Sequence, residues 1–121
     1  MAKILYVEDN EDNVYMLQRR LTRKGFDVVI AENGQVGVDK SKSENPDLIL
    51  MDLSMPVMDR WDAIKIIKGD DATKSIPVIA LSAHAMEEHR QRALESGADD
   101  YDTKPVDLER LLGKINQHLP S

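Results

Sequence analysis

The chain has 121 residues, of which 41% are hydrophobic, so it fits a single domain whose core needs no disulfide or structural metal. It contains no cysteine, which excludes disulfide and thiol chemistry, and its net charge of −6 at pH 7 argues against binding of nucleic acid over a broad basic surface. No apolar stretch approaches the length of a membrane span and the start MAKILYVEDN lacks the features of a signal peptide, so we expect one cytoplasmic domain over residues 1–121 with no membrane contact.

Short apolar runs alternate with amphipathic stretches along the chain. Uninterrupted runs of this length are typical of strands buried on both faces, and apolar residues three or four apart are typical of helices that cover a sheet. In chain order, the patterns predict a strand at 4–7, a helix at about 12–24, a strand at 28–31, a weak helix within 32–46, a strand at 48–51, a helix around 63–67, a strand at 78–81, a helix at about 86–96, a strand at 100–103 and a helix from about 107.

Turn and capping residues mark where the predicted helices begin and end. Gly25 and Gly97 follow two of them, and glycine commonly ends a helix. Asp107 is a favourable cap for the start of the last helix. Gly37 lies inside the second helix and is expected to weaken it.

The fourth helix and two of the histidines have few evident partners. The apolar stripe of this helix is thin, consisting chiefly of Met86, Ala93 and Leu94, so we expect the helix to be among the least firmly packed. His89 and His118 match no metal-binding spacing and are expected at the surface.

Five strands that alternate with five helices predict an α/β fold, in which helices cover both faces of a doubly wound parallel sheet. In such folds, ligands bind beyond the carboxyl ends of the strands. The residues that end the strands are therefore the candidates for function.

Charged and polar residues end four of the five predicted strands. The first strand runs into Glu8 and Asp9, the third into Asp52, the fourth into Ser82 and the fifth into Lys104. Taken singly, each is more often an ordinary loop residue, a helix cap or a surface lysine. Their coincidence at one edge of a sheet favours a joint function.

Three carboxylates at one edge need a counter-cation. Two carboxylates about 4 Å apart repel each other by roughly 4 kcal/mol at an effective dielectric constant of 20. Hard oxygen ligands suit Mg²⁺, which binds through one or two carboxylates and keeps positions open for phosphate oxygens. Since Lys104 and Ser82 can both hold a phosphate oxygen, Asp52 becomes a candidate nucleophile toward phosphorus.

With these residues the sequence resembles the response-regulator receiver family. Four stretches carry the resemblance, and it spans residues 3 to about 119: ILYVEDNEDN, PDLILMDLSMPVMD, IPVIALSAHA and GADDYDTKP. The resemblance implies a flavodoxin-like, CheY-like fold with five parallel strands in the order 2-1-3-4-5. It also implies a signalling module of a two-component system or phosphorelay, not an enzyme, although such a module assists its own phosphorylation and dephosphorylation.

The family's metal and acceptor roles carry over to matching positions. By this resemblance, Asp52 is the phosphorylated aspartate and Asp9 is a direct ligand of Mg²⁺. Glu8 is the acidic neighbour that acts on the metal through water. Ser54, two residues after the acceptor, gives a backbone carbonyl to the metal.

The resemblance also assigns residues to the phosphoryl group and the switch. Ser82 is the hydroxyl that moves toward the phosphate, Tyr101 is the aromatic residue that then turns inward, and Lys104 binds the phosphoryl group. Ala83 is small enough to let that group enter. His84 either tunes how fast water removes it or is an exposed loop residue, and the sequence leaves both open.

Arg60 departs from the family pattern. The family usually reads MPxMDG where this chain reads MPVMDRW. A loop glycine often has a positive φ, and a side chain there costs roughly 1 kcal/mol. Two interpretations stay open: Arg60 is a tolerated change at the start of a helix, or it lies near the site and alters phosphate lifetime or partner choice.

The resemblance implies a histidine kinase or a histidine phosphotransfer protein as phosphoryl donor, and a downstream protein that binds the face of the fourth helix, fifth strand and fifth helix. We expect a monomer, with dimerisation on activation left open.

A phosphatase with an aspartate nucleophile would need a general acid where Ser54 stands, and a flavin carrier would need small residues where EDNEDN stands. The alternative is a docking domain that works without phosphorylation, for which only Arg60 speaks.

Overall fold

Five strands and five helices alternate along the chain in the predicted order. The computed structural model describes residues 2–52, 57–82, 87–103 and 106–119, and their side chains except those of 57–62, 87–89 and 92. The elements are β1 (Lys3–Val7), α1 (Glu11–Arg23), β2 (Asp27–Ala31), α2 (Gly34–Ser43), β3 (Leu48–Asp52), α3 (Val57–Gly69), β4 (Val78–Ser82), α4 (Glu87–Glu95), β5 (Asp100–Thr103) and α5 (Leu108–His118).

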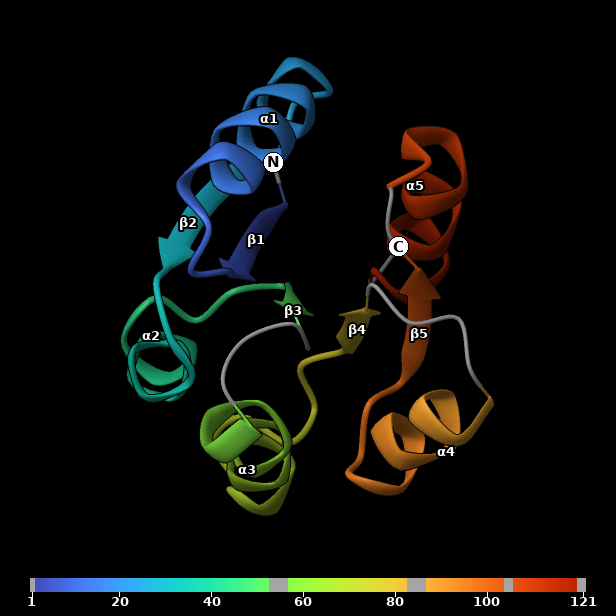
Figure 1. The fold of residues 1–121 in the computed structure, drawn as a ribbon. Coiled ribbons are helices and arrows are strands. Elements are labelled where there is room, and N and C mark those ends of the chain that lie inside the picture. The colour runs from blue at the N-terminus through green and yellow to red at the C-terminus, as the bar shows by residue number, and fades with distance from the viewer. Residues whose placement is uncertain (1, 53–56, 83–86, 104–105, 120–121) are drawn as a thin grey trace.

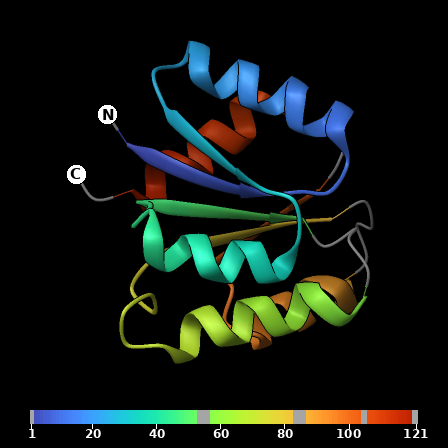
Figure 2. The same cartoon turned by 90° about the vertical axis from the view of Figure 1, so that its left-hand side faces the viewer.

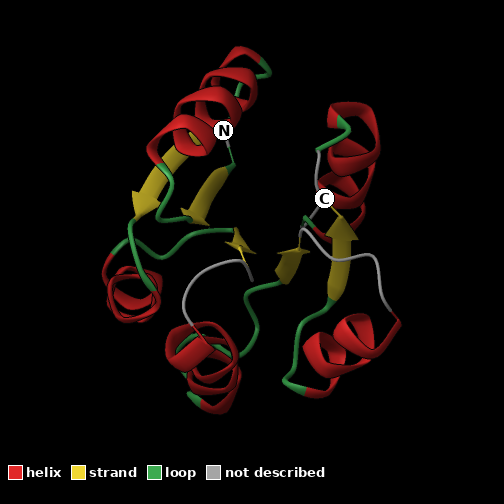
Figure 3. Ribbon diagram, in the orientation of Figure 1, coloured by secondary structure: helices red, strands yellow, loops and turns green. Residues whose placement is uncertain are grey.

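The strands form one parallel sheet in the order β2-β1-β3-β4-β5. α1 and α5 cover one face of this sheet, and α2, α3 and α4 cover the other (Figures 1 and 2). The strands thus form a middle layer between two layers of helices (Figure 3). The predicted fold class and strand order are confirmed.

The three central strands build the core. Every residue of β3 and β4 is buried, as expected for apolar runs covered on both faces. Successive side chains of a strand point to opposite faces, so the strands feed two hydrophobic clusters. Leu5, Val7, Ile49 and Met51 belong to the cluster that includes Ala63, Ile64 and Ile67 of α3. Ile4, Leu48 and Leu50 belong to the cluster that includes Leu17 and Leu21 of α1 and Leu111 and Ile115 of α5.

Gly37 has a packing role that the sequence interpretation missed. A Cβ atom at this position would lie 2.8 Å from Cγ2 of Val7, which is closer than real Cβ contacts. α2 therefore lies against β1 at a distance that only glycine allows. The residue does lower helix propensity, but it is required by this close contact.

The predicted helix ends are confirmed at the positions that the structure describes. Gly25 and Gly97 have φ values of +95° and +110°, which glycine adopts without strain. The Asp107 side chain accepts a hydrogen bond of 3.2 Å from the Arg110 backbone N–H, as a helix cap does.

The expected apolar stripe of α4 is wrong at Leu94. Ala93 is fully buried, whereas Leu94 is 36% exposed and Met86 lies outside the described residues. Consecutive helical residues point about 100° apart, so a helix that places Ala93 against the sheet turns Leu94 away from it.

Among the described residues, no helix is both long enough and apolar enough to cross a membrane.

Candidate functional site

Three carboxylates meet at the carboxyl ends of β1 and β3. The two strands pair with Val7 opposite Met51, so the next residues, Glu8 and Asp52, lie side by side at the carboxyl ends of these strands. The carboxylate oxygens of Glu8, Asp9 and Asp52 lie within 4.8 Å of one another. The expected gathering of acidic side chains at this edge is therefore present in the fold.

The three carboxylates differ in burial. Asp52 is fully buried, Glu8 is 1% exposed, and Asp9 is exposed. Asp52 ends β3 and Glu8 directly follows β1, two strands that are fixed by the core, whereas Asp9 lies one residue further into the loop. A cation at this cluster would contact a rigid inner side and a solvent-facing outer side.

Tyr6 holds Glu8 in place, and the sequence interpretation did not name it. The Tyr6 hydroxyl donates a hydrogen bond of 3.0 Å to Oε1 of Glu8, and the Asn10 N–H donates one of 3.4 Å to Oε2. Burial, followed by the charge and hydrogen bond of Glu8, raises the pKa of Tyr6, so this hydroxyl stays protonated and remains a donor. The signal was available, because residues two apart in a strand share a face.

The donor set fits a small divalent cation. Oxygen atoms of two buried carboxylates 4.8 Å apart or less repel each other by about 3.5 kcal/mol at an effective dielectric constant of 20. A cation relieves this repulsion, and carboxylate oxygens with an open, hydrated side are the ligands that Mg²⁺ prefers. Both oxygens of Glu8 accept hydrogen bonds from neighbouring groups, which fixes this carboxylate on the inner side of the cluster.

Two further predicted site residues lie on the neighbouring strands. Ser82 is the last residue of β4 and is 2% exposed. It follows Leu81, the partner of Asp52 in the sheet. Tyr101 lies in β5, opposite Ala80, and is 7% exposed within the hydrophobic cluster on the α3 side of the sheet. The aromatic ring is thus turned inward.

Several predicted residues lie outside the described part of the chain: Ser54, Ala83, His84 and Lys104. Arg60 lies within α3, so its backbone is helical, although its side chain is outside the described ones. The anticipated cost of a positive φ at Arg60 does not arise, because a helical backbone suits any L-residue.

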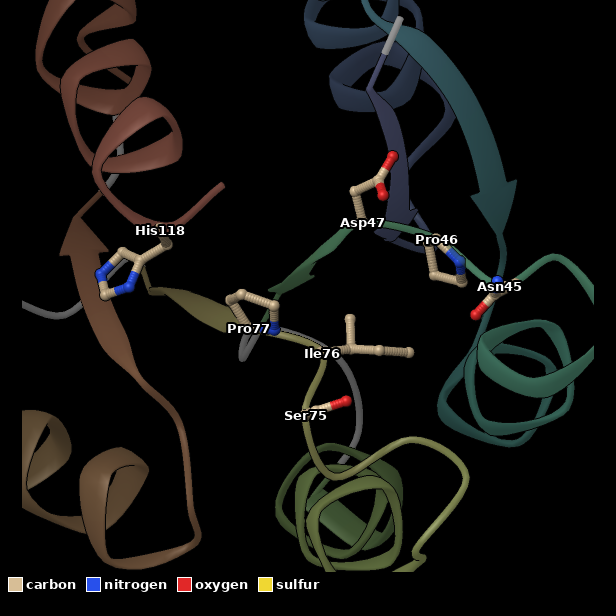
Figure 4. Close-up of a pocket in the computed structure, with 7 residues that line it drawn as sticks. All are labelled: Asn45, Pro46, Asp47, Ser75, Ile76, Pro77 and His118. Carbon is tan, nitrogen blue, oxygen red and sulfur yellow. The ribbon is translucent and has the colours of Figure 1, made fainter. Parts of the chain in front are cut away.

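One cavity adjoins the acidic cluster, and another lies at the opposite end of the strands, where β3 and β4 begin. The first has a volume of about 330 Å³ and is lined by Glu8 and Asp9 together with Glu11, Tyr15 and Glu32. The second, of about 320 Å³, lies near the amino ends of β3 and β4, between Pro46, Pro77 and His118 (Figure 4). This second cavity is remote from the strand ends where the carboxylates meet.

His118 differs from its expected role as a surface residue. Its Nε2 lies 3.0 Å from Oδ2 of Asp100, and the side chain is 22% exposed. The sequence did not reveal this pair because its two residues are 18 positions apart and meet only when α5 packs on β5. The side chain of His89 lies outside the described ones.

Comparison with known proteins places this arrangement in a family. The sequence profile of the response regulator receiver domain matches residues 4–116. The chain belongs to the response regulator receiver family. Its fold and parallel sheet order are those of a receiver domain, a signalling module and not a classical enzyme.

Relatives of this receiver domain occur both alone and inside much longer proteins. Protein PilH of Pseudomonas aeruginosa is 40% identical over 116 residues, which cover 96% of each chain. Hybrid signal transduction histidine kinase I of Dictyostelium discoideum is 40% identical over 124 residues, which cover 97% of this chain and 7% of the kinase.

A solved structure shows the same fold with a metal in place. The receiver domain of a sensor histidine kinase from Pseudomonas aeruginosa superposes with a TM-score of 0.90, with 31% sequence identity and coverage of 99% of this chain and 98% of that one. That structure has a magnesium ion coordinated in the active site cleft.

Proposed function

We propose that this receiver domain accepts a phosphoryl group on Asp52 from a phosphohistidine donor, with Mg²⁺ as cofactor. The observation that carries the proposal is the cluster of Glu8, Asp9 and Asp52, two of them buried, at the ends of two central strands. Apolar strands do not favour a buried charge at their ends unless a ligand compensates it. The acidic cluster therefore fits a site built for a cation and a phosphoryl group.

Asp9, Asp52 and the backbone carbonyl of Ser54 would hold the metal, and Glu8 would act on it through water. Bound Mg²⁺ supplies positive charge that offsets the carboxylates and the phosphoryl oxygens. An oxygen of Asp52 attacks phosphorus, so that a P–O bond forms while the P–N bond of the donor breaks and the imidazole leaves with the bonding electrons. Lys104 binds a phosphoryl oxygen, which places its ammonium where negative charge develops.

The signal then passes from the phosphoryl group to a protein-binding face. The Ser82 hydroxyl donates a hydrogen bond to a phosphoryl oxygen, and the inward position of Tyr101 stabilises that arrangement. A bias of a few kcal/mol is enough to shift a two-state element of this kind. The face formed by α4, β5 and α5 then binds a downstream protein. We place this exchange in the cytoplasm, with a histidine kinase or phosphotransfer protein as donor and a monomeric acceptor.

The proposal is tested with acetyl phosphate and intact mass measurement. We expect the protein to gain one phosphoryl group in the presence of Mg²⁺, and to gain none when Mg²⁺ is removed with EDTA or in Asp52→Asn. Asp27→Asn is the matched control, because Asp27 is exposed at the start of β2, at the opposite edge of the sheet. Phosphorylation of Asp52→Asn at the rate of the original protein would show that another residue is the acceptor.

The alternative is a docking domain of the same fold that works without phosphorylation. Its argument is the departure of Arg60 from the family pattern, and the helical backbone at Arg60 leaves that argument to the phosphorylation assay. If neither the original protein nor Asp27→Asn gains a phosphoryl group while both remain folded, the docking domain becomes the better account.

A further inference from the structure

β5 is an edge strand, and side chains take the place of a further strand beside it. In the sheet order β2-β1-β3-β4-β5, β5 pairs with β4 alone among the strands that the structure describes. The backbone groups of an edge strand need other partners. Here they are bound by two acidic residues of β5 itself and by basic residues of α5, in two similar sets of contacts.

The first set, which we name the distal clasp, consists of Asp100, Tyr101 and Lys114. Oδ1 of Asp100 accepts a hydrogen bond of 2.8 Å from the Tyr101 N–H. The ammonium of Lys114 donates to the Tyr101 carbonyl at 2.6 Å and lies 3.3 Å from the same Asp100 oxygen. One carboxylate and one cation thus bind both backbone groups of Tyr101.

The second set, which we name the site clasp, repeats this arrangement two residues nearer the acidic cluster. Oδ1 of Asp102 accepts a hydrogen bond of 2.8 Å from the Thr103 N–H and another of 2.8 Å from Nε of Arg110. Nη2 of Arg110 donates to the Thr103 carbonyl at 3.3 Å. Arg110 therefore joins α5 to the last residue of β5 through a planar, two-pronged group.

The site clasp acts on the peptide group that leads into Lys104. The carbonyl that Arg110 binds belongs to the peptide bond between Thr103 and Lys104, and that bond is a rigid plane. Side chains therefore hold both the N–H and the carbonyl of Thr103, the last described residue of β5. The distal clasp acts on Tyr101 and does not touch this peptide group.

Asp102 combines deep burial with an incompletely paired carboxylate. Asp102 is 5% exposed, and its Oδ2 is buried without a hydrogen-bond partner among the described residues. An unpaired buried carboxylate oxygen is costly for folding. A residue that is kept at such a cost is better explained by what its other oxygen positions than by stability.

We propose that Asp102 and Arg110 are positioning residues for phosphoryl transfer, which hold the entry into Lys104 so that its ammonium meets the phosphoryl group on Asp52. This inference rests on the proposed function, since it assigns to Lys104 the binding of a phosphoryl oxygen. It adds one residue of β5 and one of α5 that the sequence analysis did not assign to the site.

The experiment compares phosphorylation rates with acetyl phosphate and saturating Mg²⁺ in the original protein and six variants. They are Arg110→Met, Arg110→Lys, Lys114→Met, Lys104→Ala, and Lys104→Ala combined with Arg110→Met or with Lys114→Met. Arg110→Met keeps the stem of the side chain and removes its charged group, and Lys114→Met makes the same change in the distal clasp. Both are also made in a Lys104→Ala background. Circular dichroism and urea unfolding check that each variant is folded under the assay conditions.

We expect Arg110→Met to slow phosphorylation roughly tenfold, because small displacements of a group that stabilises the transition state cost large factors in rate. Lys114→Met should change the rate less than about twofold. In the Lys104→Ala background, Arg110→Met should have an effect of less than about twofold, since the group it positions is gone. Arg110→Lys, which keeps one donor, should restore part of the rate.

Three results would overturn the proposal. An undiminished effect of Arg110→Met without Lys104 would show that the clasp acts by another route. Equal effects of Arg110→Met and Lys114→Met would show that any loss of an α5 contact slows the reaction. If the original protein is phosphorylated and Arg110→Met is phosphorylated at the same rate, the site clasp is only structural. If Lys104→Ala is too slow to measure, the same comparison is made with the affinity for beryllofluoride and Mg²⁺ by calorimetry. Absence of phosphorylation in the original protein would instead refute the proposed function.

Discussion

Neutralising Asp52 should stabilise the fold when no metal is present. Glu8 and Asp52 are both buried, and their oxygens lie within 4.8 Å of each other and of Asp9. At an effective dielectric constant of 20, the repulsion between the two buried groups amounts to about 3.5 kcal/mol. Asn has nearly the shape of Asp, so Asp52→Asn removes the charge with little change in packing.

The expected gain is smaller than this repulsion. Asn loses the stronger hydrogen bonds that a charged oxygen accepts, which offsets part of the benefit. We therefore expect Asp52→Asn to raise the free energy of unfolding by about 1–3 kcal/mol in EDTA. Asp27→Asn, which removes an exposed charge far from the cluster, should change it by less than about 0.5 kcal/mol.

Magnesium should make the original protein more stable than Asp52→Asn, which reverses their order in EDTA. A ligand that binds only the folded state stabilises it by about 2.7 kcal/mol at one hundred times its dissociation constant. The original protein should gain this stabilisation, whereas Asp52→Asn should gain much less because a metal ligand is missing. The assay is urea unfolding followed by circular dichroism at pH 7, in EDTA and at several Mg²⁺ concentrations.

The result that would refute this reasoning is an Asp52→Asn variant that is as stable as, or less stable than, the original protein in EDTA. It would mean that other contacts of Asp52 already compensate its charge, so that the cluster does not need a cation. The main physical argument for a metal at this site would then be lost, even if the protein is phosphorylated.

Two further predictions concern packing and pH. Gly37→Ala should lower the free energy of unfolding by about 1–2 kcal/mol, because the new methyl group meets Val7 at 2.8 Å. Gly113→Ala should raise it by about 0.5–1 kcal/mol, because Gly113 lies in a helix and the new methyl group meets no atom within 4 Å. Changes of the same sign in urea unfolding would contradict this. Burial acts to raise the pKa of Asp100, but hydrogen bonds from the Tyr101 N–H and from the histidine and lysine of α5 outweigh it and lower this pKa. A carboxyl whose pKa is lowered by folding stabilises the protein above its unfolded pKa of about 3.9, and this stability is lost as the pH falls through its folded pKa. The original protein should therefore lose more stability than Asp100→Asn below about pH 4. Parallel pH profiles of unfolding for the two proteins would contradict this.

The sequence determined the layers of the fold because its signals are local. Each of the five strands was predicted to within one residue at either end, since an apolar run between turn residues depends only on its immediate neighbours. The capping role of Asp107 was predictable for the same reason. The carboxyl-end rule then placed Glu8, Asp9 and Asp52 at one edge before any coordinates were known.

Features that depend on how elements pack on one another were not predictable in the same way. The close contact of Gly37 requires the distance between α2 and β1, and the exposure of Leu94 requires the rotation of α4 about its axis. The two clasps were missed for a different reason, because their signal is spread over two elements. Asp100 and Asp102 share one face of a strand, and Arg110, Lys114 and His118 recur every fourth residue along one face of a helix.

The two spacings match because of the geometry of the elements themselves. Two residues of a strand advance about 6.7 Å and four residues of a helix advance about 6 Å, so acidic groups two apart on β5 meet basic groups four apart on α5. This match fixes the position of the helix along the strand. It also means that a shift of α5 along β5 would break both clasps together and release the peptide group before Lys104. The contacts between β5 and α5 would thus do two things. They would position the phosphoryl-binding lysine, and they hold α5, which is part of the proposed protein-binding face.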